Sequence, residues 1–295
     1  MNCRTMSYSL GISVLVLVGL GCLLSAQQQP LEGPEKTNAQ GNQQASQNKP
    51  SQTSQPQAMS KEDSDATDMA TKLFKGDLAW MQNKLSTPGT SVELHEVSRK
   101  RTDGKLVVQY EAFVKGAPTD QIYRYLNWPI NQSAPSTDLE GVTIGNNGLV
   151  ICAGRTPGQC SGEKPDDPVD LTFLPAKGEL YRLAFVSAND SVKILFAVVP
   201  DPIVASNKGC SLEVVRLMAK FELGMLRGKG FEPNQEVQFW GESYGESHTL
   251  KAKTDANGEY VAALLPFVKG KTSGKMDLSL KSASCSPSLS FEWGK

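Results

Sequence analysis

The sequence has little net charge and few histidines. Its 30 Lys and Arg residues nearly balance its 31 Asp and Glu residues, so the formal net charge is −1 at pH 7. A surface that binds nucleic acid or an anionic membrane needs an excess of basic residues, which this composition does not supply. With two histidines and no Cys-x-x-Cys pair, the sequence also lacks the usual ligand spacing of a zinc site. We therefore expect neither nucleic acid, metal nor cofactor.

The sequence also lacks a long apolar run that would span a membrane. The stretch from Leu10 to Gly21 is shorter than the roughly 20 residues that a spanning helix needs. Arg4 precedes it and Leu24-Ser25-Ala26 follows it, which is the order of parts in a signal peptide. We expect residues 1–26 to be a cleaved signal peptide, and the mature protein to be secreted or periplasmic without a stable membrane span.

The segment that follows, residues 27–62, lacks aromatic residues. Of the 34 residues from 27 to 60, ten are Gln and four are Pro. Such a segment cannot bury enough apolar surface to offset the entropy of ordering it, so we expect a disordered tether rich in Gln, Asn, Ser and Pro.

Beyond the tether the sequence predicts one short helix and then a mainly β chain. Apolar residues recur at helical spacing from Met69 to Leu85, and Pro88-Gly89 ends that pattern, which predicts a docking helix within 61–85. Alternation with period two follows, and Asp103-Gly104 is a strong hairpin signal. Because Pro200-Asp201-Pro202 interrupts the alternation, we expect two antiparallel β-sandwich-like domains, at 63–204 and 205–295.

The second domain shows seven short alternating runs within about 85 residues, which suits an immunoglobulin-like sandwich. Two stretches, Gly228-Lys229-Gly230-Phe231-Glu232-Pro233-Asn234 and Thr254-Asp255-Ala256-Asn257-Gly258-Glu259-Tyr260, resemble turns of bacterial immunoglobulin-like and carboxypeptidase-regulatory-like surface domains. The whole mature chain also resembles uncharacterised exported bacterial proteins. The resemblance implies a fold and a bacterial envelope setting, and it implies no chemistry.

Four cysteines lie beyond the signal region, and four cysteines permit three pairings. The spacing favours Cys152 with Cys160, around one short loop, and Cys210 with Cys285, joining the ends of the second domain. Both disulfides would suit an oxidising compartment.

The strongest trace of an enzyme is Gly241-Glu242-Ser243-Tyr244-Gly245, which matches the G-x-S-x-G pattern of hydrolase nucleophiles. That motif needs a helix after the serine, whereas residues 249–253 alternate like a strand. The only histidine downstream is His248, five residues from Ser243. We therefore expect a hairpin loop and no enzyme, with a secreted serine hydrolase as an unfavoured alternative.

A ligand surface is suggested by Tyr123, Tyr125 and Trp128, which cluster before Pro129. Three aromatic rings could form a platform for a sugar or a peptide, although aromatic residues at this spacing are more often core. The function that we expect is a non-catalytic binding or adhesion-type module of the bacterial cell envelope, whose partner is an envelope protein or a glycan. The alternative is a structural envelope or assembly component.

Processing gives the first test. Because the signal peptide is expected to end at Ala26, the mature protein recovered from the exporting cell should begin at Gln27 when its terminus is read by mass spectrometry. The alternative is a lipoprotein anchored through Cys22, although Gly19-Leu20-Gly21 lacks the leucine usual at the third position before such a cysteine. A diacylated Cys22 at the mature terminus would contradict the expectation.

Overall fold

The computed structural model describes residues 61–132, 134–153, 160 and 166–294. The expected signal peptide, Cys22 and nearly all of the expected tether lie outside the described residues. The described residues form one helix and sixteen strands, which confirms the predicted mainly β fold class with one short helix before it. The elements are α1 (Lys61–Met81), β1 (Ser91–Thr102), β2 (Lys105–Lys115), β3 (Tyr123–Pro129), β4 (Ser136–Ile144), β5 (Val150–Cys152), β6 (Leu171–Phe173), β7 (Tyr181–Ser187), β8 (Lys193–Val198), β9 (Ile203–Asn207), β10 (Cys210–Arg216), β11 (Gly224–Lys229), β12 (Glu236–Ser243), β13 (Glu246–Lys253), β14 (Tyr260–Leu264), β15 (Gly274–Lys281) and β16 (Ser288–Trp293).

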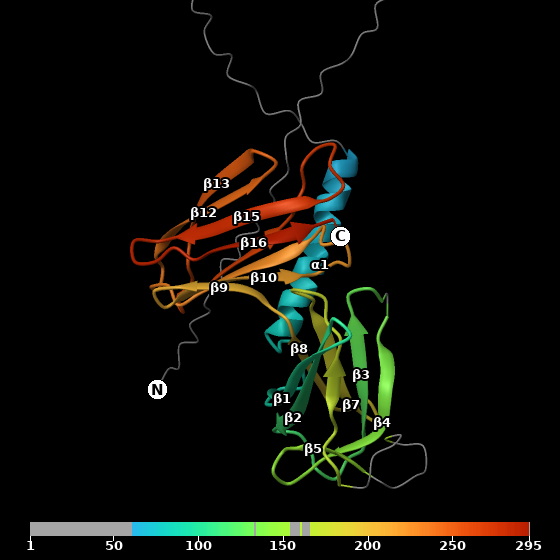
Figure 1. The fold of residues 1–295 in the computed structure, drawn as a ribbon. Helices are drawn as coiled ribbons and strands as arrows, with labels where there is room; N and C mark the ends of the chain where they lie inside the picture. Colours follow the sequence, from blue (N-terminus) through green and yellow to red (C-terminus); the bar gives the residue numbers. More distant parts are fainter. Residues whose placement is uncertain (1–60, 133, 154–159, 161–165, 295) are drawn as a thin grey trace, which may run out of the picture.

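Strands β1 to β8 form two antiparallel sheets, which we call the first sheet pair (lower half of Figure 1). One sheet has the order β1-β2-β6 and the other β5-β4-β3-β7-β8. Alternate residues of β2, from Val108 to Val114, are buried in a core that both sheets line. The period-two pattern of the sequence therefore predicted the inward face of this strand. The hairpin turn at Asp103 and Gly104 has positive φ at both residues, as a two-residue turn of type I′ requires.

Strands β9 to β16 form the second sheet pair (upper half of Figure 1), with the orders β14-β11-β10-β9 and β13-β12-β15-β16. A second core lies between these sheets and includes Leu212, Phe239 and Leu278, all nearly fully buried. The sandwich is closed along one side, where β9 contacts β16. The arrangement is sandwich-like, while the narrower immunoglobulin-like relation stays a prediction.

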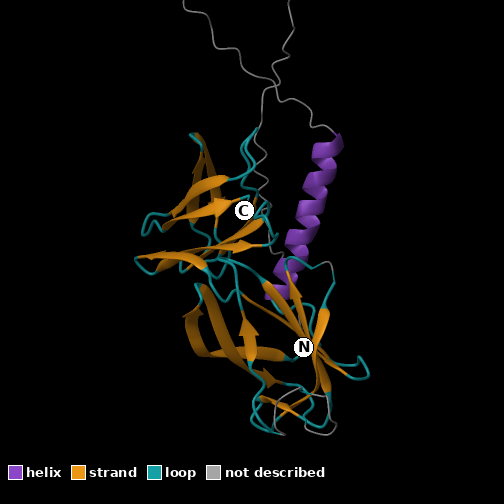
Figure 2. Ribbon diagram, turned by 45° about the vertical axis from the view of Figure 1, so that its right-hand side comes forward, coloured by secondary structure: helices purple, strands orange, loops and turns teal. Residues whose placement is uncertain are grey.

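Helix α1 covers the outer face of the sheet β14-β11-β10-β9 and reaches down to the first sheet pair (Figures 1 and 2). Phe74 and Leu78 of the helix are buried with Val215 of β10 and Met225 of β11, in a third core that also includes Leu180. Strands β10 and β11 are therefore buried on both faces, because one face meets the second core and the other meets the helix. The helix is the docking element that the sequence predicts, although Met69 and Leu73 of the predicted apolar face are exposed.

The lower end of the helix is fixed to the first sheet pair by a buried ion pair. Arg182 of β7 donates to both carboxylate oxygens of Asp77, and the two side chains are 10% and 7% exposed. The Arg182 guanidinium also lies 5.2 Å from the centre of the Trp128 ring. Trp80, one turn further along the helix, donates its indole N–H to the backbone oxygens of Leu183 and Phe196. The pair is thus held by hydrogen bonds and by a cation–π contact at a site with little water.

The segment before β7 joins the two sheet pairs through its backbone. Arg216, the last residue of β10, donates its backbone N–H to the oxygen of Gly178 at 2.7 Å and accepts from the N–H of Leu180 at 3.3 Å. Gly178 has φ of 75°, and a Cβ there would lie 2.7 Å from the Cδ1 atom of Ile203. Only glycine suits this backbone conformation and this close approach.

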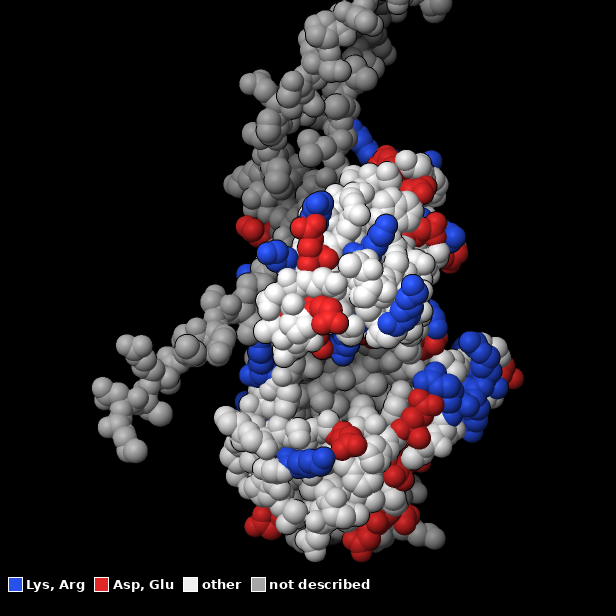
Figure 3. All heavy atoms as spheres, turned by 90° about the vertical axis from the view of Figure 1, so that its left-hand side faces the viewer, with Lys and Arg blue, Asp and Glu red and all other residues white. Residues whose placement is uncertain are grey.

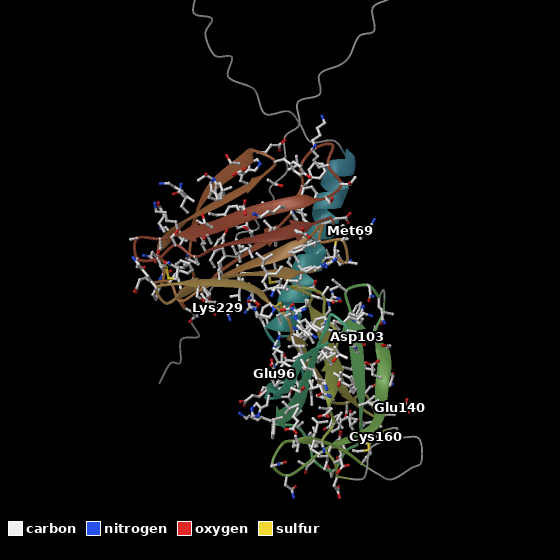
Figure 4. All side chains as sticks on the ribbon, in the orientation of Figure 1. Met69, Glu96, Asp103, Glu140, Cys160 and Lys229 are labelled. Atoms are coloured by element: carbon white, nitrogen blue, oxygen red, sulfur yellow. A yellow bond between two sulfur atoms is a disulfide. The ribbon has the colours of Figure 1, made fainter. Side chains whose placement is uncertain are left out.

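The structure joins Cys152 to Cys160 and Cys210 to Cys285, which is the pairing that the spacing favours. Cys160 lies at the end of the first sheet pair that is far from the helix (Figure 4). Cys210 begins β10, and Cys285 lies in the connection between β15 and β16. The second disulfide therefore links the two sheets of the second sheet pair.

The structure differs from the sequence expectation at the end of the helix. The helix ends at Met81, four residues before Leu85, because residues 82–86 turn toward β8 and bond to its edge. Strand β9, Ile203–Asn207, spans the expected division between residues 204 and 205 and pairs with β10. Domain limits stay a prediction. No helix within the described residues is long and apolar enough to cross a membrane.

The buried ion pair gives a stability prediction. Asp77→Ala leaves Arg182 charged and buried without its partner, so it should lower the free energy of unfolding by about 3 kcal/mol, measured by urea denaturation. Asp68→Ala, at an exposed position of the same helix, should change it by less than about 0.5 kcal/mol. The double variant Asp77→Leu/Arg182→Met should recover much of the loss. Equal stability of the Asp77→Ala and Asp68→Ala proteins would contradict this account.

Candidate binding site at the edge of the second sheet pair

A small pocket lies where the first residues of β13 meet the chain after β14, and we call it the edge pocket. Its lining residues come from β12, β13, β15 and the connection between β14 and β15: Ser243, Glu246, His248, Leu265, Phe267, Val268 and Met276. Met276 and Val268 are each 5% exposed and provide an apolar interior. Glu246 is exposed and His248 half-buried, so the rim carries a carboxylate and an imidazole.

Two exposed aromatic side chains belong to this end of the sheet pair. Phe267 lines the edge pocket and is 55% exposed, and Tyr244, which follows the lining residue Ser243, is 56% exposed. They are the two Phe, Tyr or Trp residues that are more than half exposed among the residues the structure describes. Both come from loops rather than from strand faces. Exposed aromatic side chains are typical of binding surfaces.

Tyr244 is held in place by its neighbours. It forms the β12–β13 turn with Gly245, and both residues have positive φ. Its phenol donates a hydrogen bond to the backbone oxygen of Ser273 at 2.8 Å, while the ammonium of Lys271 lies 4.8 Å from the ring centre. The ring also meets the edge of Trp293, with centroids 6.5 Å apart. The side chain is therefore ordered before any ligand arrives, which lowers the entropy cost of binding.

The hydroxyl of Ser243 is held by hydrogen bonds within the protein. Its hydroxyl donates to the backbone oxygen of Lys275 at 2.7 Å and accepts the indole N–H of Trp293 at 3.1 Å. His248 lies opposite Gly241 in the strand register, whereas Ser243 lies opposite Glu246. A serine nucleophile needs a base that takes its proton, and here the proton points to a backbone carbonyl. The segment after the motif is β13, so the helix that the hydrolase motif requires does not follow the serine.

The three aromatic residues that the sequence suggested as a ligand platform do not form a common exposed surface. Tyr123 and Tyr125 are buried in the first core at 0% and 5% exposure, and burial raises the pKa of both phenols. Trp128 lies at the foot of the helix, where its ring meets Trp80 edge-on with centroids 5.8 Å apart. The reason is the alternation of β3, which turns Tyr123 and Tyr125 to the same inward face.

The ionisable side chains in the described part of the chain do not form a metal-binding cluster. No group of three or more His, Cys, Asp or Glu side chains there is placed to hold a metal ion. His95 lies on the exposed strand β1, with Nε2 2.9 Å from Oε1 of Glu93. Hydrogen bonds from His95 and Lys115 lower the pKa of the Glu93 carboxyl. Figure 3 shows Lys and Arg interspersed with Asp and Glu on the face that it presents, as the balanced composition suggests.

Comparison with known proteins gives little beyond this geometry. No family model matches the chain, and no curated protein matches it. Among solved structures, the crystal structure of a DUF3823 family protein from Bacteroides ovatus is similar over 70% of this chain and 99% of that chain. The sequence identity is 11% and the TM-score is 0.19, which is too low to transfer either fold or function.

Sequence reasoning missed Phe267 and singled out Tyr244 only as part of a serine motif. Phe267 follows Leu264-Leu265-Pro266 at the end of an apolar run, and such a run reads as the end of a buried strand. Pro266 was the available signal, because a proline has no N–H to donate to a strand ladder and so argues that the buried strand ends before it. Phe267 lies beside His248 because the connection after β14, a strand of one sheet, passes β13 of the other sheet. No local sequence pattern predicts this contact.

The environment of Ser243 predicts a loss of stability rather than of chemistry. Ser243→Ala removes the acceptor of the buried Trp293 N–H, so it should lower the free energy of unfolding by about 1–3 kcal/mol in urea denaturation. Ser247→Ala, at an exposed position of β13, is the matched control and should have little effect. A Ser243→Ala protein of unchanged stability that had lost a hydrolytic turnover would assign the serine to catalysis instead.

Proposed function

We propose that this protein is an exported, non-catalytic binding module of the bacterial cell envelope, and that it holds its ligand at the edge pocket. The observation that carries the proposal is that the strongly exposed ring of Phe267 lines a small pocket, while Tyr244, which is equally exposed, directly follows the lining residue Ser243. Large apolar side chains in water are unfavourable for solubility, and they stabilise a complex when a ligand covers them. Loops at the end of a rigid sandwich are a common place for such a site.

The lining supports binding of a ligand with both apolar and polar groups. Met276 and Val268 offer a dry interior, and Phe267 offers an exposed ring face. Glu246 accepts hydrogen bonds, and His248 donates or accepts them at the rim. The pocket is small, so it suits one side chain or one ring of a larger ligand, with the rest of the ligand lying along the neighbouring surface.

The environment of Ser243 supports a non-catalytic role. Its hydroxyl donates to the backbone oxygen of Lys275 and accepts from the indole N–H of Trp293. Export is supported by the two disulfides, which are usual in oxidising compartments. It is also supported by the expected signal peptide. The immunoglobulin-like or carboxypeptidase-regulatory-like relation of the second sheet pair fits this role, because such surface domains display loops without a reaction centre.

Capture experiments test the proposal. The mature protein, immobilised and exposed to an extract of its own cell envelope and separately to a glycan array, should retain a ligand that the Phe267→Ala variant loses by tenfold or more. Tyr244→Ala should weaken the same retention. The matched control is Leu174→Ala, which removes a side chain 59% exposed in the connection before β7, and it should retain the ligand normally.

Three results would overturn the proposal. One is a ligand retained equally by the wild-type and Phe267→Ala proteins, because the edge pocket would then have no part in binding. Another is no saturable ligand together with a stable envelope assembly that contains the protein, which would favour the structural alternative. The third is turnover of the captured material.

A further inference from the structure

Strand β13, which forms one wall of the edge pocket, is the last strand of its sheet. The sheet order is β13-β12-β15-β16, so β13 pairs with β12 on one side and with no described strand on the other. Its side chains that face the core, His248, Leu250 and Ala252, are only half-buried. Their partners across the ladder on β12 are Gly241, Phe239 and Val237, and these are buried. The core of the sandwich is therefore incompletely covered along this edge.

The backbone of β13 presents a regular row of hydrogen-bonding groups at this edge. Tyr244 and Gly245 form a two-residue turn, so the closing pair Ser243 and Glu246 is a hydrogen-bonded pair and the pairs alternate from there. By this alternation the N–H and C=O groups of Ser247, Thr249 and Lys251 point away from β12. The register with β12 has no bulge over all eight residues. The edge is thus straight enough for another strand to pair with it.

Three other sheet edges, those of β8, β1 and β9, are protected. Ser86 exchanges hydrogen bonds with the backbone of Leu195 at 2.7 and 3.0 Å, and Thr87 donates its backbone N–H to the oxygen of Lys193 at 2.7 Å, so the edge of β8 is covered. Strand β1 has a bulge between Glu96 and Ser98, which interrupts its register. Strand β9 is packed against β16. Natural sheets use such devices to prevent unwanted pairing, and β13 has neither a cover nor a bulge among the described residues.

We propose that β13 accepts an extended peptide segment of a partner protein as an added strand, and that the edge pocket holds one apolar side chain of this segment. The inference rests on the proposed function, since it names the ligand of the same pocket. A row of alternating donors and acceptors at a strand edge matches an extended peptide backbone and has no counterpart in a sugar ring. The half-buried row of His248, Leu250 and Ala252 would then be covered.

The side chains around the edge specify the sequence pattern of the partner. Residues of the added strand that face inward lie beside Leu250, Ala252 and Phe267, so they should be apolar. Residues that face outward lie beside Lys251 and Lys253, which are exposed and cationic. Acidic residues at those positions would give favourable cross-strand pairs. The expected partner segment therefore alternates apolar and acidic residues.

A synthetic peptide tests this directly. The probe is an acetylated, amidated and fluorescently labelled peptide that alternates Val and Glu over seven residues, titrated against the full mature protein by fluorescence anisotropy. We expect saturable binding that is lost when alternate amides of the peptide are N-methylated, because methylation removes main-chain donors and keeps every side chain. In hydrogen exchange of the wild-type protein, the amides of Ser247, Thr249 and Lys251 should become protected when the unmethylated peptide is added.

Variants of the protein give the second arm. Thr249→Pro removes one outward N–H in the middle of β13 while the ladder to β12 is kept, because proline is tolerated at such edge positions. It should weaken peptide binding about tenfold, whereas Thr249→Val, which keeps the N–H, should bind as the wild type does. Phe267→Ala should weaken binding similarly, because the apolar side chain loses a wall of its pocket. Circular dichroism establishes that each variant is folded, and the exchange measurement needs no variant.

The outcomes separate this inference from the proposed function. If an envelope ligand depends on Phe267 but neither the peptide nor the β13 amides respond, the strand inference is overturned and the binding function stands. If the N-methylated peptide binds as tightly as the parent, strand addition is likewise overturned. Concentration-dependent self-association that Thr249→Pro abolishes would replace the partner peptide with a second copy of this chain. If no ligand, including the peptide, responds to Phe267→Ala, both proposals fail together.

Discussion

The buried contact between Asp77 and Arg182 is the interaction on which the arrangement of this protein depends. It fixes the lower end of helix α1 to β7 of the first sheet pair, while Phe74 and Leu78 pack on β10 and β11 of the second. A buried charge without its partner is strongly destabilising. The contact therefore favours the one helix position that brings Asp77 to Arg182. The helix in turn covers apolar strand faces that would otherwise meet water.

Much of the fold could be predicted because local chemistry determines it. Period-two alternation marks the inward face of β2, and Asp103-Gly104 marks its hairpin. The position of the helix was harder to predict. Its face was inferred from apolar spacing, yet Met69 and Leu73 are exposed while the charged Asp77 is buried. Burial of Asp77 depends on Arg182, which is more than 100 residues away in the sequence, so no local pattern contains it.

The candidate site could be predicted only in fragments. The sequence drew attention to Ser243 and Tyr244 for a catalytic motif, and the structure shows them as the end of a β12–β13 hairpin. Tyr123 and Tyr125 lie in the first core, because residues two apart in a strand point to the same face and this face of β3 is turned inward. The edge pocket depends on where β13 and the chain after β14 meet in space. Strand pairing across a sandwich involves residues that are distant in sequence, and sequence periodicity does not encode which edges remain uncovered.

The position of helix α1 at the start of the described chain has a consequence for the order of folding. A polypeptide emerges from the ribosome with its N-terminus first, so the helix exists as chain long before Leu223 and Met225 have been made. Leu223 and Met225, which belong to its docking surface, come about 150 positions after Phe74. Contacts of such high sequence separation form slowly. The apolar face of the helix therefore cannot be fully covered until the chain has been made as far as Ala263 of β14.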